Sequence, residues 1–358
     1  MRTARGIKAF ALVGALALVA GGLAACGGST EPTPSDSSTS AKTALKIGLA
    51  YDIGGRGDKS FNDMAAAGLD KAKTDPNFTV DAQELPATLN ESEADKETRL
   101  TTLCKGGYNP VIAIGFAYAT ALAAVAPQCP DVSFAIVDDS SVTLPNVTSL
   151  IFAEEQGSFL VGAAAALKSQ ANHIGFIGGC LVPLIQKFEA GYVAGAKQVK
   201  PDIKIEINYL STGADGCSGF NDPAKGKIQA EGEYDAGADI VYQAAGGSGV
   251  GVFQAAQEKS KKAIGVDSDQ YNSVDAPLNS VIMTSMQKRV DTAVYTFIKD
   301  FADTNGKPTT GARTFDLKVD GVGYATSGGF VDDIKSKLDD YKAQIISGAI
   351  KVPTEPAA

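Results

Sequence analysis

Short apolar runs alternate with longer amphipathic stretches from Leu45 onward, and this alternation constrains the fold more than any other feature. The short runs suit strands buried on both faces, and the amphipathic stretches suit helices that cover a sheet. Strands are expected at 45–51, 110–116, 133–137, 173–177, 203–210, 240–243, 262–266 and 281–285. Helices are expected at 60–74 (with Ser60 as N-cap), 89–105, 118–126, 156–169, 184–199, 223–236, 250–258 and 289–303.

The pattern restarts after Ser149, so the chain reads as two successive βα halves of similar size. About 310 residues follow the N-terminal region, which is more than one core usually supports. We therefore predict an α/β protein with two doubly wound, Rossmann-like lobes around a cleft at the carboxyl ends of the strands. Residues 45–150 and 270–303 are assigned to the N-terminal lobe, and 151–269 and 304–352 to the C-terminal lobe. Hinge crossings are expected near residues 150, 269 and 303.

The N-terminus has the pattern of a secretory signal that ends at a cysteine. Three positive charges in the first eight residues precede an uncharged run that ends in Leu23-Ala24-Ala25-Cys26. This junction resembles the bacterial lipobox, which implies a signal peptide at 1–25 and lipidation of Cys26; the alternative is an ordinary signal with an incidental cysteine. Residues 26–44 are rich in Gly, Ser, Thr and Pro and read as a flexible tether. We expect a cell-membrane protein anchored on the extracytoplasmic face.

The net charge and the hydropathy of the chain limit the kinds of ligand and membrane contact that we expect. The formal net charge is −9, and removal of three basic residues with the signal would make it −12. Such a charge disfavours nucleic acid, anionic lipid and highly charged anionic ligands. The best later candidate for a membrane span, 150–167, is interrupted by Glu154, Glu155 and Gln156. Contact with the membrane is therefore expected through the lipid only.

Four cysteines would remain besides the lipidated Cys26, and an even number in an exported protein indicates disulfides. Cys104 and Cys129 both follow helices that flank one strand, and Cys180 and Cys217 both follow adjacent strands. The predicted topology therefore pairs Cys104 with Cys129 and Cys180 with Cys217. The single histidine, His173, precedes a strand and reads as structural, and neither Cys nor His spacing supports a metal site.

A polar, glycine-rich loop at 52–62 follows the first strand and opens a helix. It matches neither GxGxxG nor the P-loop, and its two carboxylates would repel a phosphate. Asp, Ser and Asn side chains instead suit hydroxyl and amide-like groups on a ligand. Phe61 could offer a stacking face at the end of this loop. The alternative is that Phe61 belongs to the core and the loop is only a turn.

The loop is the first of several segments, in order along the chain, that resemble the basic membrane protein family of PnrA-like purine nucleoside-binding lipoproteins. The segments are DIGGRGDKSFND (52–63), FAIVD (134–138), SGFNDPAKGK (218–227), AGGSGVGVF (245–253), IGVDSDQ (264–270) and TSMQK (284–288). The resemblance covers nearly the whole mature chain. It implies the type I periplasmic solute-binding protein fold, a role in an ABC importer and nucleoside binding. The segment 212–218 is longer than expected for the family, which leaves Tyr234 as an alternative to Phe220.

The resemblance also implies a ligand site. Phe61 and Phe220, one from each lobe, would sandwich the base. Asp138 would accept hydrogen bonds from the base, unless it is only a loop residue beside Asp139. Asp267 would accept from the ribose hydroxyls, with Asp269 a weaker candidate.

Five further residues would complete this site. Lys288 would donate to a ribose oxygen, and Gly247 would let the backbone approach the sugar. Asp52, Ser60 and Asn62 would form a polar rim, whereas Asp58 could shape the loop instead. No catalytic residue, cofactor or metal is expected.

We therefore predict a monomeric, lipid-anchored receptor that binds nucleosides, preferably purine nucleosides, and passes them to an ABC transporter permease. Binding would close the lobes by a hinge motion. One rival is a receptor of the same fold for a sugar or signalling molecule. Another is a nucleoside hydrolase, which is disfavoured because the site lacks a histidine base, a nucleophile elbow and a metal-spaced cluster.

Overall fold

The computed structural model describes residues 42–357. The predicted signal peptide, the lipidation site Cys26 and most of the predicted tether lie outside these residues. The end of the tether was misplaced, because the first strand already begins at Thr43.

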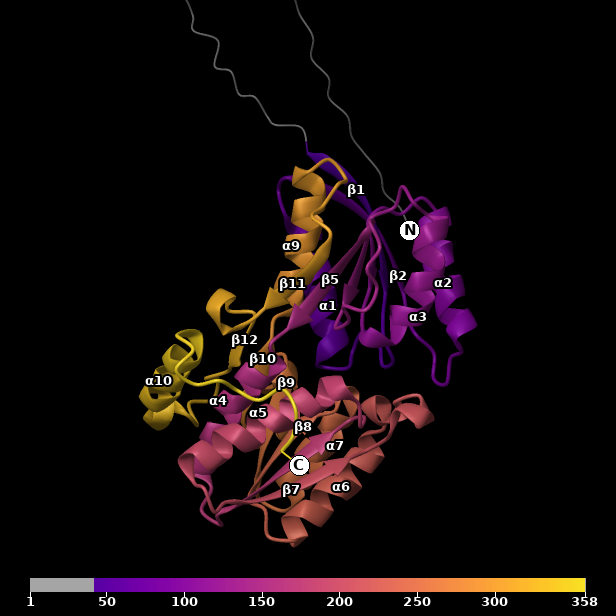
Figure 1. Cartoon of the computed structure of the whole chain (residues 1–358). Helices are drawn as coiled ribbons and strands as arrows, with labels where there is room; N and C mark the ends of the chain where they lie inside the picture. Colours follow the sequence, from indigo (N-terminus) through magenta and orange to yellow (C-terminus); the bar gives the residue numbers. More distant parts are fainter. Residues whose placement is uncertain (1–41, 358) are drawn as a thin grey trace, which may run out of the picture. The chain divides into compact units, whose positions relative to one another are not determined.

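Two six-stranded sheets organise the described chain (Figure 1). The first has the order β11-β5-β4-β3-β1-β2 and the second the order β12-β10-β9-β8-β6-β7. All pairings between these strands are parallel except that of β10 with β12. The first sheet comprises β1 (Thr43–Ala50), β2 (Phe78–Leu85), β3 (Val111–Ala113), β4 (Phe134–Val137), β5 (Val147–Phe152) and β11 (Gly311–Phe315). The second comprises β6 (His173–Gly178), β7 (Lys204–Tyr209), β8 (Ile240–Ala244), β9 (Lys262–Asp267), β10 (Ile282–Lys288) and β12 (Val322–Tyr324).

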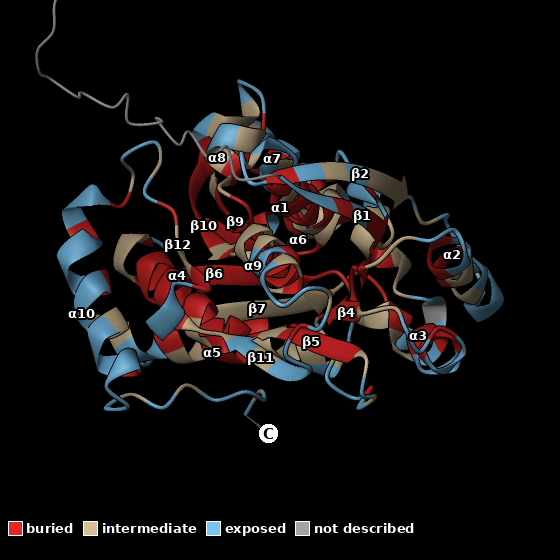
Figure 2. Cartoon of the chain, turned by 90° about the horizontal axis from the view of Figure 1, so that it is seen from above, coloured by how far each residue is buried: buried red, intermediate tan, exposed pale blue. Residues whose placement is uncertain are grey.

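Helices cover both faces of each sheet, because the central strands are apolar on both sides. On the first sheet, α1 (Phe61–Thr74) and α9 (Val290–Asp303) pack on one face, and α2 (Glu93–Lys105) and α3 (Ala119–Val125) on the other. Side chains of β3 alternate between these two cores: Ile112 joins the first and Val111 the second. Figure 2 shows the resulting burial of β4 and β5, whereas the edge strand β2 is largely intermediate or exposed.

The second sheet is built in the same way. Helices α4 (Glu154–Lys168) and α5 (Pro183–Val199) cover one face, and α6 (Pro223–Asp235) and α7 (Gly249–Glu258) cover the other. The short helix α8 (Gln270–Ser273) follows β9, and α10 (Lys335–Ile346) packs against α4. The prediction of two doubly wound α/β halves is therefore confirmed.

The described chain crosses between the two sheets three times, and only the first of these crossings was predicted correctly. The first crossing, between β5 and α4, lies at residue 153, close to the predicted 150. The predicted crossings near 269 and 303 are wrong: β10 stays in the second sheet, and β11 returns to the first. The actual crossings follow Lys288 and Phe315. The error arose because β11 and β12 are short edge strands without an apolar run, so neither was predicted.

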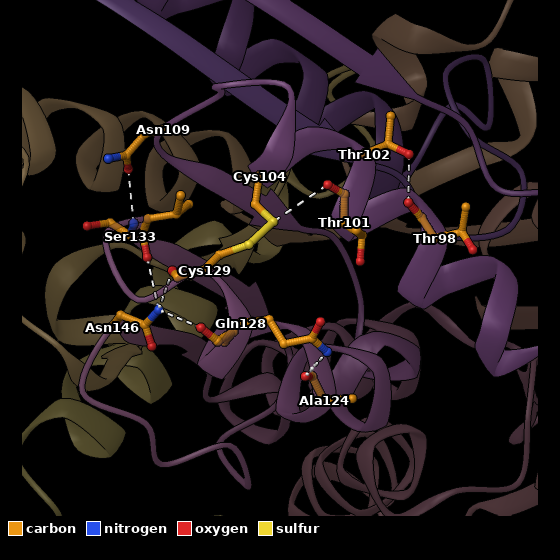
Figure 3. Close-up of a disulfide and its surroundings, with 12 residues drawn as sticks. Thr98, Thr101, Thr102, Cys104, Asn109, Ala124, Gln128, Cys129, Ser133 and Asn146 are labelled. Carbon is orange, nitrogen blue, oxygen red and sulfur yellow. Dashed lines mark hydrogen bonds between the residues drawn. A yellow bond between two sulfur atoms is a disulfide. The ribbon is translucent and has the colours of Figure 1, made fainter.

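Both predicted disulfides are present in the structure. Cys104 at the end of α2 bonds to Cys129, with 6.4 Å between their Cα atoms (Figure 3). Cys180 after β6 bonds to Cys217, with 5.1 Å between their Cα atoms. Each disulfide joins two segments that lie at the same end of the parallel strands of its sheet, as the predicted topology implied.

Candidate ligand-binding site

The loop between β1 and α1 is held by side chains that cap the helix. Ser60 occupies the N-cap position but makes no capping bond with its side chain. Asp58 caps α1 instead, because its carboxylate accepts from the backbone N–H groups of Ser60, Asn62 and Asp63. The Asn62 amide accepts from the Asp52 N–H at 3.0 Å and donates to the carbonyl of Ile53 at 3.2 Å. These bonds fix the position of the adjoining Phe61.

A cavity lies where the carboxyl ends of strands from the two sheets face each other. It encloses about 560 Å³ of empty space, part of it open to solvent, and we call it the inner pocket. Its lining comprises Asp52, Ile53, Asp58, Phe61, Asn62, Gly115, Phe116, Asp138, Leu184, Ile185, Phe188, Phe220, Ala244, Gly246, Val266, Asp267 and Lys288.

Seven of the nine predicted ligand-binding residues line the inner pocket: Asp52, Phe61, Asn62, Asp138, Phe220, Asp267 and Lys288. The other two lie just outside the lining. The Ser60 hydroxyl donates to Asp267 at 2.5 Å, and Gly247 adjoins the lining residue Gly246. Tyr234 is buried and donates to the carbonyl of Lys262, so the structure favours Phe220 over that alternative.

Sequence reasoning missed the apolar wall of the pocket. Phe116 comes from the 3₁₀ turn Phe116–Tyr118, and Leu184, Ile185 and Phe188 come from the first turns of α5. Only the position of these segments directly after β3 and β6 could have indicated them, because they carry no recognisable motif. Gly179 was missed too: a Cβ there would come within 2.3 Å of the Phe220 ring, so a side chain would displace that ring.

Lys288 links the two sheets beneath the pocket. It is the last residue of β10, and its Nζ lies 2.6 Å from Oδ2 of Asp138, which follows β4 in the other sheet. Nζ also lies 3.1 Å from Oε1 of Glu154, the first residue of α4. The rings of Phe61, Phe152 and Phe188 surround it at 5.3, 5.0 and 5.5 Å.

The acidic residues of the inner pocket are perturbed by burial. Burial raises the pKa of Asp138 to about 6, although the nearby Lys288 opposes this shift. Burial likewise raises the pKa of Asp267 to about 7 against Lys288 and the Ser60 hydroxyl, and that of Asp52 to about 7 against the Ile53 N–H. Burial alone would lower the pKa of Lys288, but Asp138, Glu154 and Asp267 raise it above its usual value. The pocket thus combines a firmly charged cation with carboxyls that titrate near neutral pH.

Within residues 42–357, no group of three or more His, Cys, Asp or Glu side chains is placed to hold a metal ion. His173 begins β6, at the amino end of its strand, and bonds to Glu206 at 2.9 Å. Asp269 bonds to Asn272 and Ser327 and does not line the inner pocket. Both residues therefore lie outside the candidate site.

Residues 44–355 match the family model of PnrA-like ABC transporter substrate-binding proteins. The chain belongs to this family. It is 37% identical over 359 residues to the ABC transporter nucleoside-binding protein BmpA of Lactococcus lactis, covering 96% of this chain and 98% of that protein. It is 32% identical over 294 residues to an uncharacterized lipoprotein of Pyrococcus horikoshii, covering 78% of this chain and 69% of that protein.

A solved structure supports the same assignment. The ABC transporter solute-binding protein of Aeropyrum pernix superposes with a TM-score of 0.74 at 28% identity, covering 87% of this chain and 94% of that one. This family comprises substrate-binding proteins of ABC transporters, so the prediction that the PnrA-like chain is not an enzyme is confirmed. Among the described helices, none combines the length and apolar character that a membrane span requires.

Proposed function

We propose that this PnrA-like protein is a lipid-anchored receptor that binds nucleosides in the inner pocket and delivers them to an ABC permease. The observation that carries the proposal is the pairing of half-buried phenyl rings with buried carboxylates and one lysine in a single cavity. Flat faces suit a base, and the ionic groups suit the polar edges of a base and a ribose. The name of the Lactococcus relative, a nucleoside-binding protein, points to the same ligand class.

The base would lie between Phe61 and Phe220. These rings come from elements of different sheets, α1 and the 3₁₀ turn Ser218–Asn221, so a ligand between them contacts both halves. Stacking of this kind contributes about 1–3 kcal/mol per base. Asp138 Oδ1 is buried without a hydrogen-bond partner among the described residues, and it could accept from an N–H group of the base. Purines are the preferred bases in this proposal, because two fused rings offer Phe61 and Phe220 a larger stacking face than a pyrimidine ring does.

The ribose would lie against Asp267 and Lys288. An ammonium group has three donors; Lys288 donates one to Asp138, and the charge of Glu154 lies 3.1 Å away. A donor therefore remains for a ribose oxygen. Asp267 would accept from the ribose hydroxyls beside the Ser60 hydroxyl, and the backbone at Gly246 and Gly247 allows the sugar to come close.

The anchor would be a diacylglyceryl group on Cys26, for which the signal-like N-terminus is the support. Mass spectrometry of the membrane-extracted protein should find Cys26 as its lipidated N-terminus. A mature protein that begins at another residue and is released from the membrane would contradict this assignment. We also propose that the receptor acts as a monomer.

The nucleoside proposal is tested by calorimetric titration of the domain 42–358 with nucleosides, free bases, nucleotides and simple sugars. Wild-type protein should bind nucleosides and not nucleotides. Phe61→Ala and Phe220→Ala should each weaken binding at least about tenfold, because each removes one stacking face. Phe330→Ala, which removes a ring outside the inner pocket, is the control and should leave affinity unchanged. Binding of sugars alone, or full affinity in both pocket variants, would overturn the proposal.

A further inference from the structure

A second cavity, which we call the outer chamber, adjoins the inner pocket. It encloses about 1110 Å³ of empty space, part of it open to solvent. Asp52, Ile53, Phe116 and Phe220 line both cavities, so the two adjoin at these side chains. The rest of the outer lining comprises Thr88, Asn90, Glu91, Glu93, Lys96, Ala117, Thr120, Val182, Gly213, Gly216, Cys217 and Ser218.

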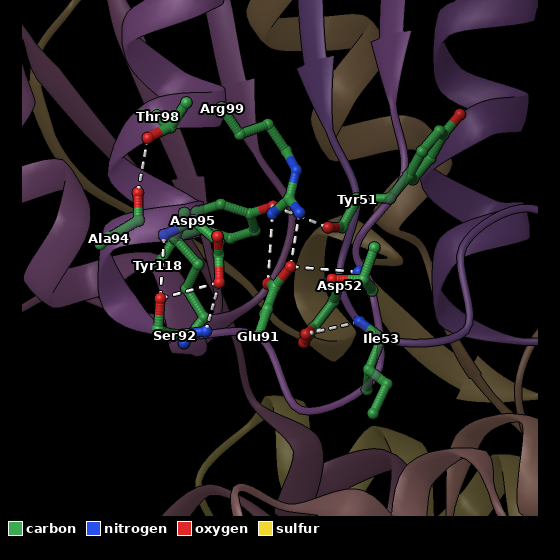
Figure 4. A network of polar contacts seen from close by, with 12 residues as sticks. Tyr51, Asp52, Ile53, Glu91, Ser92, Ala94, Asp95, Thr98, Arg99 and Tyr118 are labelled. Atoms are coloured by element: carbon green, nitrogen blue, oxygen red, sulfur yellow. Dashed lines mark hydrogen bonds and ion pairs between the residues drawn. The ribbon is translucent and has the colours of Figure 1, made fainter.

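The first wall of the outer chamber is held by a buried polar network (Figure 4). Arg99, on α2, forms an ion pair with Glu91 and donates to the Tyr118 hydroxyl at 2.6 Å. That hydroxyl in turn donates to the backbone carbonyl of Tyr51 at 2.8 Å. Ser92 and Asp95 form a capping box at the start of α2. The loop that carries Glu91 is thereby fixed to both β1 and α2.

The opposite wall comes from the second sheet and is fixed as well. The disulfide between Cys180 and Cys217 ties the loop at 213–218 to the end of β6. The Ser211 hydroxyl donates to the carbonyl of Gly179 at 2.7 Å and accepts from the N–H of Gly219 at 3.0 Å. Two walls held in this way suit a preformed binding site better than a loose entrance.

The position of the outer chamber indicates which end of a bound nucleoside would lie next to it. The chamber shares Asp52 and Phe220 with the inner pocket, whereas Asp138, Asp267 and Lys288 do not line it. In the orientation argued above, the ribose lies at Asp267 and Lys288, so the chamber opens beside the base. A group attached to the base would therefore enter the chamber, whereas a group on the ribose would not.

The charges that line the outer chamber indicate which charge a group attached to the base could carry. Asp52, Glu91 and Glu93 supply three carboxyls, and Lys96 is the one cation among the described lining residues. Lys96 already contacts Glu93 at 2.6 Å and Arg99 is paired with Glu91, so Asp52 is the carboxyl of these three without an ion pair within residues 42–357. A negatively charged group in this space would meet carboxylates without a free cation to pair with.

We propose that the outer chamber is a subsite for an uncharged or positively charged substituent on the exocyclic amine of the base. The inference rests on the proposed function, since it takes the nucleoside orientation from it. The receptor would accordingly accept base-modified nucleosides as well as unmodified ones. The apolar side chains of Ala117 and Val182 would contact the stem of the substituent, and the carboxyls would face its end.

The test compares an unmodified nucleoside with derivatives of its exocyclic amine by calorimetric titration. With adenosine as parent, the probes are N6-benzyladenosine, N6-(6-aminohexyl)adenosine and N6-succinyladenosine. If guanosine or cytidine is the parent that binds, the same substituents are placed on its own exocyclic amine. The neutral and cationic derivatives should bind within about threefold of the parent or more tightly, and the succinyl derivative at least about tenfold more weakly.

Two variants separate the chamber from the inner pocket. Thr120→Trp should fill the outer chamber and weaken the benzyl and aminohexyl derivatives at least about tenfold while leaving the parent nucleoside unchanged. Thr102→Trp, at an exposed position on α2 outside the chamber, is the matched control and should change neither. The subsite alone would be overturned if wild-type protein bound the parent nucleoside but not the neutral derivative. It would also be overturned if Thr120→Trp weakened the binding of the parent and of the derivatives equally. If no nucleoside binds, the proposed function fails and the subsite fails with it.

Discussion

Lys288 is the residue on which the two halves of the molecule depend most directly. Its ammonium group is buried between Asp138 of one half and Glu154 of the other. Removing one partner from a buried ionic group leaves uncompensated charge, which usually costs about 3–5 kcal/mol. We expect Lys288→Met to lower the free energy of unfolding by that amount in urea titrations at pH 8.

A surface lysine and a compensating variant serve as controls. Lys299→Met removes an exposed ion pair with Asp303 and should change stability by less than about 1 kcal/mol. Adding Asp138→Asn and Glu154→Gln to Lys288→Met should recover most of the lost stability, because the buried charges then disappear together. A Lys288→Met protein as stable as the wild type would show that these carboxyls are neutral in the folded state.

The buried Glu233 side chain should make the stability of the protein depend on pH. It is buried on α6, where it accepts from Asn208 at 2.9 Å, and burial raises its pKa from 4.5 to about 8. The folded state therefore holds a proton that the unfolded state releases above about pH 4.5. Stability is lost as the pH rises from about 4.5 to 8, by at most about 1.4 kcal/mol per unit from this group.

Glu233→Gln should remove that loss. In urea titrations the variant should match the wild type near pH 5 and exceed it at pH 8.5. Glu231→Gln, on the same helix but less buried, should leave the difference in unfolding free energy between pH 5 and pH 8.5 as it is in the wild type. If Glu233→Gln showed the same difference in unfolding free energy as the wild type, that result would count against a protonated Glu233.

At the residue scale, the motifs predicted the polar groups of the inner pocket better than its walls. Phe61, Asp138 and Asp267 were found because each stands directly after a strand or loop with a distinct pattern. Phe188 was not found, because a phenylalanine on an amphipathic helix has the same sequence pattern whether it faces a core or a cavity. Glu154 was seen only as an interruption of an apolar run, since its partner Lys288 lies far away in sequence.

At the scale of elements, α4 and α5 pack closely against each other. A Cβ on Gly195 would lie 2.0 Å from the carbonyl oxygen of Phe159, and one on Gly162 would lie 2.1 Å from that of Tyr192. These helices therefore touch backbone to backbone. Gly195→Ala should force them apart and lower the free energy of unfolding by about 1–3 kcal/mol.

Gly232 provides the matched control for this substitution. It lies inside α6, and a Cβ there would meet nothing within 4 Å. Gly232→Ala should therefore raise stability by about 0.5–1 kcal/mol, because alanine restricts the unfolded chain and favours the helix. Thermal and urea unfolding of both variants measure the contrast. Equal effects of the two substitutions would contradict the close approach of α4 and α5.

Most of the strands that the sequence did not predict lie at sheet edges. The central strands other than β5 were found from their apolar runs; β5 was missed although it is buried between β4 and β11, and β2 is an edge strand whose side chains are mostly half-buried or exposed. The edge strands β11 and β12 are short and contain few apolar residues. Their pairing is decided by neighbours distant in sequence, so no local pattern records it.

At the scale of the whole described chain, the contacts across the inner pocket bear on the proposed closure. Lys288 joins Asp138, the Ser60 hydroxyl joins Asp267, and the Ser268 hydroxyl donates to the carbonyl of Lys59 at 2.8 Å. A ligand that touches both halves would favour the conformation in which these contacts form. Small-angle scattering should show a smaller radius of gyration with a nucleoside than without it. A simple sugar that does not bind is the control, and an identical radius with and without nucleoside would argue against closure.

The interleaving of the two sheets also affects how the protein can be made. β11 completes the first sheet and β12 the second, and both lie after α9, near the end of the chain. A nascent chain on the ribosome would therefore lack part of the first sheet until Phe315, and part of the second sheet until Tyr324, had been synthesised. Domains that are contiguous in sequence can fold one after the other during synthesis, but these two halves must finish together. A single cut between β5 and β6 would leave the second sheet complete but would separate β11 from the first sheet, so no single cut yields two fragments that each contain a complete sheet.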